Sequence, residues 1–267
     1  MQSLSGCGGH RHMYACSMTG HEIETNQRTF DHAANPDFHC CENVILLPFG
    51  RRSYLPAIVD TCDGESVELD ETTDRELYTL HHSGRDLTLV YSGMGGPACA
   101  NALEMVRSNG ARRVVVFGAC GGVVPTLNVG ALVAATGAVR GEGTSSWYAP
   151  PEFPALFDPR LTVALADAAG RRHEVLSGVV FTTDAGYRQD ASIYDTYRNL
   201  VIAIECECAT AAVVSARLGL TAGALLFCTD NVTLPKPSDQ RYRGLADPRV
   251  RAAFDAGLAT CLKVLTN

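Results

Sequence analysis

The stretch Val201–Asp230, VIAIECECATAAVVSARLGLTAGALLFCTD, gives the clearest indication of the fold. It begins with the apolar run Val201–Ile204, continues through Ala209–Leu218 with Ala, Val and Leu at helical spacing, and ends in a second apolar run, Ala222–Phe227. Short apolar runs on either side of a helical segment are typical of buried parallel strands joined by a helix. The stretch therefore predicts a strand–helix–strand unit.

Similar runs extend this alternation over most of the chain. The further strand candidates are Val44–Pro48, Leu87–Tyr91, Val114–Phe117, Ala131–Ala135 and Val175–Phe181, and the further helix candidates are Pro97–Asn109, Pro159–Ala169 and Asp247–Val264. Pro97 and Pro159 stand where the first turn of a helix tolerates proline. We therefore expect an α/β domain with a mainly parallel sheet, whose ligands bind at the carboxyl ends of the strands.

Length and composition fit a single globular domain, which we place at residues 42–267. Of the 267 residues, 46% are apolar and 19% are charged, enough to bury one sizeable core. The formal net charge of −7 argues against the cationic surface that binds nucleic acid. No apolar run reaches the roughly 20 residues of a membrane span. We expect a cytoplasmic protein without a nucleic-acid or membrane partner.

Residues 1–41 differ from the rest, because they hold five histidines and four cysteines among polar residues and glycine. We expect a loosely ordered N-terminal arm, and a metal site built from Cys7, His10, His12 and Cys16 is the alternative. The other cysteines lie mostly in apolar stretches and lack zinc-type spacing, so we expect buried thiols there and no metal.

Two glycine clusters follow predicted strands, at Gly93–Gly96 and at Gly118–Gly122. Because glycine permits positive φ and a close backbone approach, either turn could present amides to an anion. Glycines that only make tight strand exits are the alternative.

Acidic residues follow two of the predicted strands. Glu205 and Glu207 are two apart at the end of Val201–Ile204, so both carboxylates can face one side and accept hydrogen bonds from a ribose diol. An acidic pair that merely complements a helix dipole is the alternative. Asp230 follows the apolar stretch Ala222–Cys228, where burial would raise its pKa and make a proton donor; a turn cap is the alternative.

These motifs together resemble the uridine phosphorylase and purine nucleoside phosphorylase family, over roughly residues 87–232. Leu87–Gly96, LTLVYSGMGG, is similar to the family's strand ending in Ser/Thr-Gly-x-Gly-Gly, and GACGG after Val114–Phe117 is similar to its second glycine turn. The segment from Asn128 to Pro154 looks especially like uridine phosphorylases. Glu205-Cys206-Glu207 stands where the family has the ribose-binding Glu-Met-Glu.

The resemblance implies a fold, an assembly and a reaction. The fold is a three-layer α/β/α sandwich with a mixed, mainly parallel central sheet. The assembly is a homo-oligomer, a dimer or a trimer of dimers, with sites shared between subunits. In the reaction, phosphate attacks C1′ of a nucleoside while charge builds on the departing base. Inorganic phosphate is then the candidate cosubstrate, and no cofactor is expected.

The same resemblance assigns roles to residues. Glu207 would anchor the sugar and Asp230 would protonate a purine at N7, which makes these two the catalytic candidates. The other substrate-binding candidates are Glu205, Cys206, Gly121, Tyr187, Gln189 and Thr229. Tyr187 would stack on the base. Gln189 lies near the place of the glutamine that reads uracil, so it favours a pyrimidine, whereas Asp230 favours a purine; we lean towards a purine.

The phosphate site departs from the family pattern. Val116 stands in place of an arginine and Ala119 in place of a Ser or Thr in the second glycine turn. The anion candidates are Gly50, Arg51, Arg52, Arg75 and the position of Ala119. Losing charge-assisted contacts to a buried anion costs several kcal/mol, so either shifted arginines hold the phosphate or water replaces it.

The sequence therefore predicts an enzyme that cleaves the N-glycosidic bond of a nucleoside, by phosphorolysis or by hydrolysis. Two alternatives stay open. One is a nucleotide-like substrate whose own anionic group meets the remaining arginines. The other is a nucleoside-binding or storage protein of the same fold with weakened catalysis.

Overall fold

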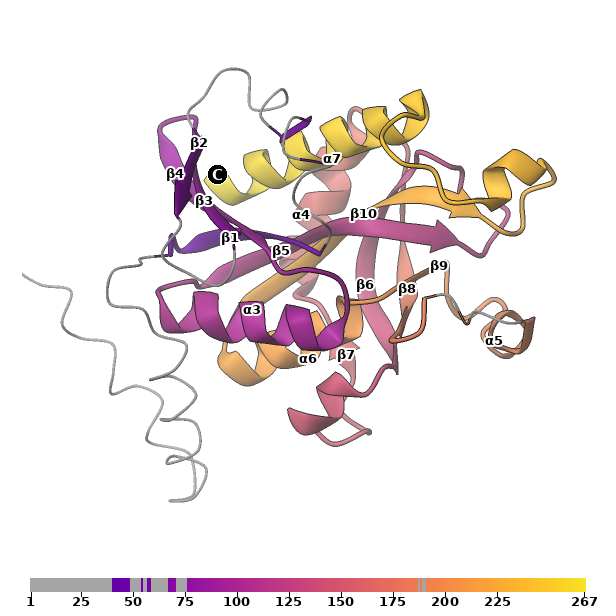
Figure 1. Cartoon of the computed structure of the whole chain (residues 1–267), viewed down its shortest axis with the longest axis horizontal. Coiled ribbons are helices and arrows are strands. Elements are labelled where there is room, and N and C mark those ends of the chain that lie inside the picture. The colour runs from indigo at the N-terminus through magenta and orange to yellow at the C-terminus, as the bar shows by residue number, and fades with distance from the viewer. Residues whose placement is uncertain are drawn as a thin grey trace, which may run out of the picture.

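A ten-stranded sheet organises the residues that the computed structural model describes, which are 40–48, 54, 57–58, 67–70, 76–186, 188 and 191–267 (Figure 1). The strands are β1 (Asn43–Leu47), β2 (Val67–Asp70), β3 (Glu76–His82), β4 (Arg85–Tyr91), β5 (Arg113–Gly122), β6 (Leu132–Gly141), β7 (Ala155–Leu156), β8 (Val175–Thr183), β9 (Ala203–Glu205) and β10 (Thr221–Asn231). The helices are α3 (Gly96–Ser108), α4 (Pro159–Gly170), α5 (Ala191–Thr196), α6 (Cys208–Leu218) and α7 (Pro248–Thr266), with 3-10 helices η1 (Thr144–Trp147) and η2 (Pro237–Gln240).

Five of the strands close a ring of pairings. β5 pairs in parallel with β10, β10 pairs antiparallel with β6, and β6 pairs in parallel with β8. β8 then pairs in parallel with β9, and β9 returns antiparallel to the end of β5. Strands β1, β4, β3 and β2 extend the sheet outward from the beginning of β5. The predicted mixed sheet is confirmed, and the ring sets the ends of β5, β9 and β10 beside one another.

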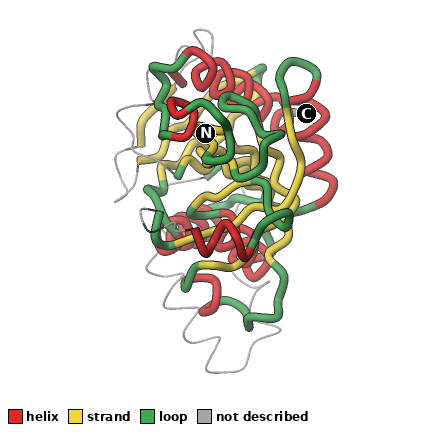
Figure 2. The backbone as a smooth tube through the Cα atoms, turned by 90° about the vertical axis from the view of Figure 1, so that its right-hand side faces the viewer, coloured by secondary structure: helices red, strands yellow, loops and turns green. Residues whose placement is uncertain are grey.

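Helices cover both faces of the sheet, which confirms the three-layer α/β/α arrangement (Figures 1 and 2). α3 and α6 pack on one face, and α4 and α7 pack on the other. Along β5, Val114 and Val116 belong to the first core and Val115 and Phe117 to the second. Because both faces are covered, the strand is continuously apolar from Val114 to Phe117 instead of alternating with polar residues.

The four predicted helices are confirmed to within two residues at either end. Asp158 starts α4 by accepting a hydrogen bond of 2.8 Å from the backbone N–H of Leu161. Asp247 starts α7 in the same way, accepting from the N–H of Arg249 at 2.9 Å. Each cap is followed directly by a proline in the first helical turn, the sequence signature of a helix start.

The prediction that Gly118–Gly122 forms a turn is wrong, because β5 runs on through Gly122. Its backbone pairs with β10 throughout and with β9 at the end. The glycines make room for neighbouring side chains: a Cβ at Gly118 would lie 2.9 Å from Pro48, and one at Gly122 would lie 2.6 Å from the amide nitrogen of Asn231. Close approach between strands thus explains these glycines.

Some predictions concern residues outside the described ranges. They include most of the expected arm at residues 1–41, with the alternative metal site of Cys7, His10, His12 and Cys16, and both stay predictions. Within the described ranges, no helix has both the length and the apolar character needed to cross a bilayer.

Candidate functional site

The acidic triplet lies where β9 ends and α6 begins. Glu205 is the last residue of β9, and Glu207 occupies the position that caps α6. Their side chains are only 5% and 4% exposed, respectively. The free-energy cost of burying two carboxylates this deeply must be offset by hydrogen bonds. The hydrogen-bond partners of each carboxylate therefore limit the role that it can take.

Both carboxylate oxygens of Glu205 accept hydrogen bonds from the protein itself. Its Oε2 accepts the backbone N–H of Glu207 at 2.6 Å and of Cys208 at 2.7 Å, and its Oε1 accepts a short hydrogen bond from the Thr182 hydroxyl. Thr182 in turn accepts the N–H of Ala209 at 2.8 Å. Burial raises the pKa of Glu205, and the bonds from Thr182 and the backbone oppose that rise. This carboxylate orients the start of α6.

Glu207 reaches across to a different loop. Its Oε1 accepts the backbone N–H of Gly95 at 2.6 Å, which joins the β4–α3 turn to the triplet. Gly95 has φ +96°, a conformation that L side chains rarely adopt, so the turn needs glycine to aim this N–H. Burial, together with the charge of Glu205, raises the pKa of Glu207 to about 8. A carboxylate has about four acceptor positions, so Glu207 keeps capacity for a hydroxyl ligand.

Asp230 lies near the end of β10, after an irregularity in the pairing with β5 between Cys228 and Asp230. There its Cα partner is Gly121, and a Cβ built on Gly121 would be 3.2 Å from Oδ2 of Asp230. The Thr229 hydroxyl donates to Oδ1 at 2.7 Å. Burial raises the pKa of Asp230, and the Thr229 hydrogen bond opposes the rise. The glycine leaves space for a half-buried carboxyl with an elevated pKa.

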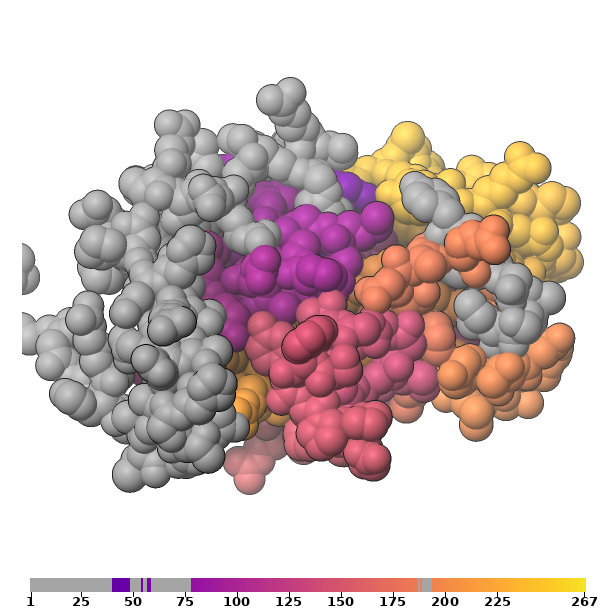
Figure 3. Space-filling model, turned by 60° about the horizontal axis from the view of Figure 1, so that its bottom comes forward, coloured from indigo at the N-terminus to yellow at the C-terminus, as the bar shows by residue number. Residues whose placement is uncertain are grey.

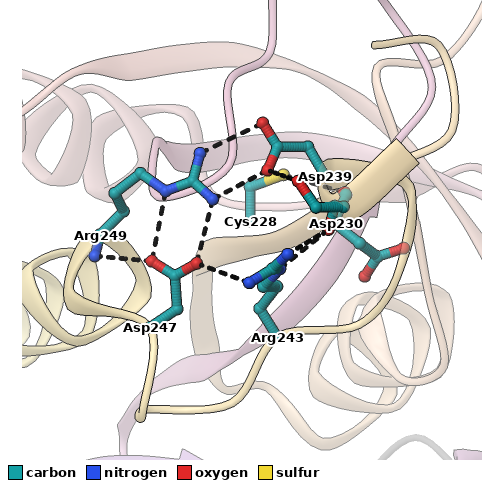
Figure 4. Close-up of polar contacts among 7 residues, drawn as sticks. Cys228, Asp230, Asp239, Arg243, Asp247 and Arg249 are labelled. Carbon is teal, nitrogen blue, oxygen red and sulfur yellow. Dashed lines mark hydrogen bonds and ion pairs between the residues drawn. The ribbon is translucent and has the colours of Figure 1, made fainter. Parts of the chain in front are cut away.

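Hydrogen bonds and ion pairs hold the segment after Asp230, residues 232–247, at both ends. At its start the Asn231 amide donates to the carbonyl oxygens of Val124 and Leu127, at 2.8 and 2.6 Å. At its far end the Arg249 guanidinium binds two carboxylates, those of Asp239 and Asp247, at 2.9 and 3.0 Å (Figure 4). The backbone that follows Asp230 is therefore tied to α7 by charge.

A cavity of about 300 Å³ opens beside this segment. Its aliphatic walls come from Val123, Val201, Ile204 and Val232. Ile204 pairs with Gly121, which is also the Cα partner of Asp230, so the cavity lies on the part of the sheet where β9 and β10 end. Tyr194 and Tyr197 close it from the side of α5. Burial and the negative charge of Asp230 raise the pKa of Tyr194, as expected for a phenol facing that carboxyl. The lining suits a flat, mostly apolar ring.

Cys206 lies between the two glutamates and is half-buried. Its Sγ lies 3.7 Å from where a Cβ of Gly186 would be. Burial and the charges of Glu207, Glu205 and Asp184 raise the thiol pKa to about 12. Cys206 therefore stays a neutral thiol at physiological pH and can contribute only packing and weak hydrogen bonding.

The anion candidates Gly50, Arg51, Arg52 and Arg75 lie outside the described residues, as do the base-pocket candidates Tyr187 and Gln189. Among the described positions, Val116 is buried in the core beneath α3 and α6, and Ala119 packs against the core beneath α7. Neither can offer a side-chain hydrogen bond. In the described part of the chain, no group of three or more His, Cys, Asp or Glu residues could hold a metal ion.

Sequence reasoning missed the residues that orient the acids. Gly95 belongs to the predicted glycine turn Gly93–Gly96, but its partner Glu207 is 112 residues away along the chain. Thr182 is the next-to-last residue of β8 and pairs with Glu205 of β9, and a polar residue near the end of a buried strand was the available signal. The sequence around Tyr194 and Arg198 did not indicate that they line the cavity, because no local pattern shows which way α5 faces.

Comparisons with known proteins show what the whole chain is similar to. The family model described as the phosphorylase superfamily matches residues 44–262. A guanosine phosphorylase of Halorubrum lacusprofundi is 33% identical over 191 residues, covering 71% of this chain and 78% of that protein. A uridine phosphorylase of Treponema pallidum is 34% identical over 185 residues, covering 64% and 69%.

Solved structures show the same fold. Purine nucleoside phosphorylase from Toxoplasma gondii, in complex with immucillin-H, matches with a TM-score of 0.73 and 21% identity, covering 85% of this chain and 90% of that one. Uridine phosphorylase from Vibrio fischeri also has a TM-score of 0.73, with 22% identity and coverage of 85% and 92%. At these identities the structures speak for the fold alone.

Proposed function

Because the chain belongs to the phosphorylase superfamily, we propose that it cleaves the N-glycosidic bond of a nucleoside by phosphorolysis. The observation that carries this proposal is the hydrogen bond of 2.6 Å between the Gly95 N–H and the Glu207 carboxylate. It unites the two motifs at the edge of the sheet where β9 and β10 end and where Asp230 also lies. A sugar held at Glu207 would place its base in that cavity.

Each acid has a separate task in this proposal. Glu207 accepts hydrogen bonds from the sugar hydroxyls, in a position fixed by Gly95, while Glu205 acts indirectly by holding the triplet. Phosphate oxygen forms a bond to C1′ as the bond from C1′ to the base breaks, with the bonding electrons going to the base. Asp230, whose raised pKa favours the protonated form, donates its proton to the base nitrogen. The products are the free base and the sugar 1-phosphate.

The cation that would hold phosphate is proposed to come from Arg51, Arg52 or Arg75. Hydrolysis, with water as the nucleophile, is the second candidate, since the side chains of Val116 and Ala119 offer no hydrogen bond to an anion. A binding protein without turnover is a third. The relatives are named guanosine and uridine phosphorylases, so both purine and pyrimidine nucleosides belong in any test.

The experiment incubates purified protein with inosine, guanosine, adenosine, uridine and cytidine, with and without phosphate, and measures free base and sugar 1-phosphate. Phosphorolysis predicts both products in equal amounts and only with phosphate. Release of base without phosphate would support hydrolysis instead. Thermal stabilisation by nucleoside with no product from any substrate would support the binding protein.

A further inference from the structure

The two buried glutamates of the triplet accept unequal sets of hydrogen bonds. Glu205 accepts the backbone N–H groups of Glu207 and Cys208 on Oε2 and the hydroxyl of Thr182 on Oε1. Glu207 accepts backbone N–H groups, with that of Gly95 at 2.6 Å. Among the described residues, a side-chain hydroxyl therefore donates to Glu205 but not to Glu207.

The direction of the hydrogen bond from Thr182 is fixed by its other partner. A hydroxyl has one hydrogen and two acceptor positions. The Thr182 oxygen accepts the N–H of Ala209 at 2.8 Å, in the first turn of α6, where backbone N–H groups have no partner within the helix. Thr182 is completely buried, so its hydrogen points to Glu205 and not to water. Glu205 must then act as an acceptor at both of its oxygens.

A proton is consequently less favourable on Glu205 than on Glu207. On Glu205 it would meet one of three donors already directed at that carboxylate, and a buried donor left without an acceptor costs free energy. Burial raises the pKa of both glutamates, and the charge of Glu205 adds to the rise of Glu207 to about 8, whereas the bonds from Thr182 and the backbone oppose the rise of Glu205. At neutral pH the pair holds one proton, and it lies on Glu207.

The other titratable groups described beside the glutamates are three thiols and one carboxyl. They are Cys120 of β5, Cys206 between the glutamates, Cys208 at the start of α6 and Asp184 after β8. Burial raises the pKa of Cys208 and, to about 12, that of Cys206, and the Cys228 thiol and burial raise that of Cys120, so the thiols stay neutral. The Asp184 carboxylate accepts the N–H of Gly143 at 2.8 Å. These groups therefore supply no positive charge that would ionise both glutamates.

On the basis of the proposed function, in which Glu207 holds the sugar, we propose that Thr182 is a positioning residue that keeps the proton of the glutamate pair on Glu207. Sugar hydroxyls donate more strongly to an ionised carboxylate than to a neutral one, so nucleoside binding releases this proton. Thr182 thus sets the pH above which the site binds a nucleoside tightly, although it lies beneath the site and does not touch the ligand.

The experiment measures the dissociation constants of inosine and uridine by calorimetry without phosphate, across the pH range around the pKa of Glu207. It compares the wild type with Thr182→Val, which keeps the shape but loses the hydroxyl, and with Thr182→Ser, which keeps the hydroxyl. Thr162→Val, at a buried threonine of α4, is the matched control. If base is released without phosphate, KM replaces the dissociation constant.

Wild-type affinity should rise with pH and level off above about 8. In Thr182→Val the proton moves to Glu205, so the midpoint of this rise should fall by about one pH unit, as expected for the loss of one hydrogen bond to a charged group. Thr182→Ser and Thr162→Val should keep the wild-type midpoint. Weaker binding of Thr182→Val at every pH with an unchanged midpoint would mean that Thr182 only supports α6, and would overturn the proposal.

A second measurement needs the wild type alone. Calorimetry in two buffers of different ionisation enthalpy counts the protons released, and we expect about one for each nucleoside bound at neutral pH. Binding without proton release would also overturn the proposal.

If the wild type neither binds nor cleaves any nucleoside, the proposed function fails separately. Thr182 is then tested in the free protein by the dependence of Tm on pH. A steeper fall of Tm with rising pH in Thr182→Val, because its folded state binds more protons, supports the control of charge by Thr182. A uniformly lower Tm with the wild-type slope refutes it.

Discussion

At the scale of single residues, Glu205 and Glu207 tie the stability of the protein to pH. The pKa of Glu207 lies at about 8 in the folded chain, against an ordinary value of 4.5, because the carboxyl is desolvated beside another acid. Between those values the folded state binds more protons than the unfolded state, so the free energy of unfolding falls as the pH rises.

Replacing Glu207 by Gln should therefore flatten this slope. We expect Glu207→Gln to have a higher Tm than the wild type near pH 8 and a smaller advantage near pH 5, measured by thermal unfolding across that range. Turnover should fall at the same time, since the amide is a poorer acceptor for the sugar. A wild-type slope in the variant would show that another group titrates.

Replacing Asp230 should affect purine and pyrimidine nucleosides differently. Asp230→Asn keeps the shape of the side chain but removes the acidic proton, so kcat for purine nucleosides should fall by roughly 10²–10⁴. Pyrimidine nucleosides, which are not protonated at N7, should lose far less. Asp167→Asn, on the exposed side of α4, is the matched control. Equal losses for both classes would remove the reason for preferring a purine.

At the scale of elements, the β4–α3 turn and the β9–α6 junction act as one unit. Gly95→Ala places a Cβ at φ +96°, a strained conformation that costs on the order of 1–3 kcal/mol. The expected result is a lower Tm together with a higher KM for nucleoside, because the N–H that holds Glu207 is misdirected. Gly244→Ala is the control, since nothing lies within 4 Å of its added Cβ and its φ is not positive. A normal KM in Gly95→Ala would separate this hydrogen bond from substrate binding.

The ion pairs of Arg249 with Asp239 and Asp247, which hold residues 232–247, also have a measurable role (Figure 4). The hydrogen bond from Arg249 holds the pKa of Asp239 below its ordinary value, so this contribution to stability is present at neutral pH and is lost as the pH falls through the lowered pKa. Asp239→Asn should release the segment at neutral pH. We expect faster tryptic cleavage at Arg241 and Arg243 and a higher KM, compared with Asp255→Asn on α7. Unchanged cleavage would mean that the other contacts suffice.

At the scale of the whole molecule, η1 carries the one tryptophan of the chain, Trp147, whose side chain is 89% exposed. A Cβ on Gly96, at the start of α3, would lie 2.7 Å from the Thr144 hydroxyl, so η1 packs beside the turn that holds Glu207. Figure 3 shows the segments around η1 and α3 adjoining on one face. Met94, in that turn, is 68% exposed. Exposed apolar residues that gather beside a site are typical of an interface.

If the chain forms the proposed homo-oligomer through this face, Trp147→Glu should shift it towards the monomer. Light scattering after gel filtration measures the mass, and the emission of this single tryptophan should move to longer wavelength on dilution. Val163→Glu, at another exposed apolar site on α4, should leave the mass unchanged. A monomeric wild type that retains full activity would contradict shared sites.

Much of the fold could be predicted because the spacing of apolar residues within a helix or strand shows which of its faces are buried. Strands covered on both faces are continuously apolar, and helices covered on one face carry apolar residues every three or four positions. This is why α3, α4, α6 and α7 and most of the central strands were located. The limits of β5 and β6 were not, since a strand's length depends on how far its neighbours pair with it.

By itself, the sequence identified the acids that we propose to carry the chemistry, Glu205, Glu207 and Asp230, each at or near the end of a strand. Only the tertiary structure decided which partners each acid meets. The ring of strands turns Glu205 inward, joins Glu207 to Gly95 and sets Asp230 against Gly121. Gly95 and Gly121 each lie about a hundred residues from their acid along the chain, and these two contacts depend on strand pairing across the sheet, which no local pattern encodes.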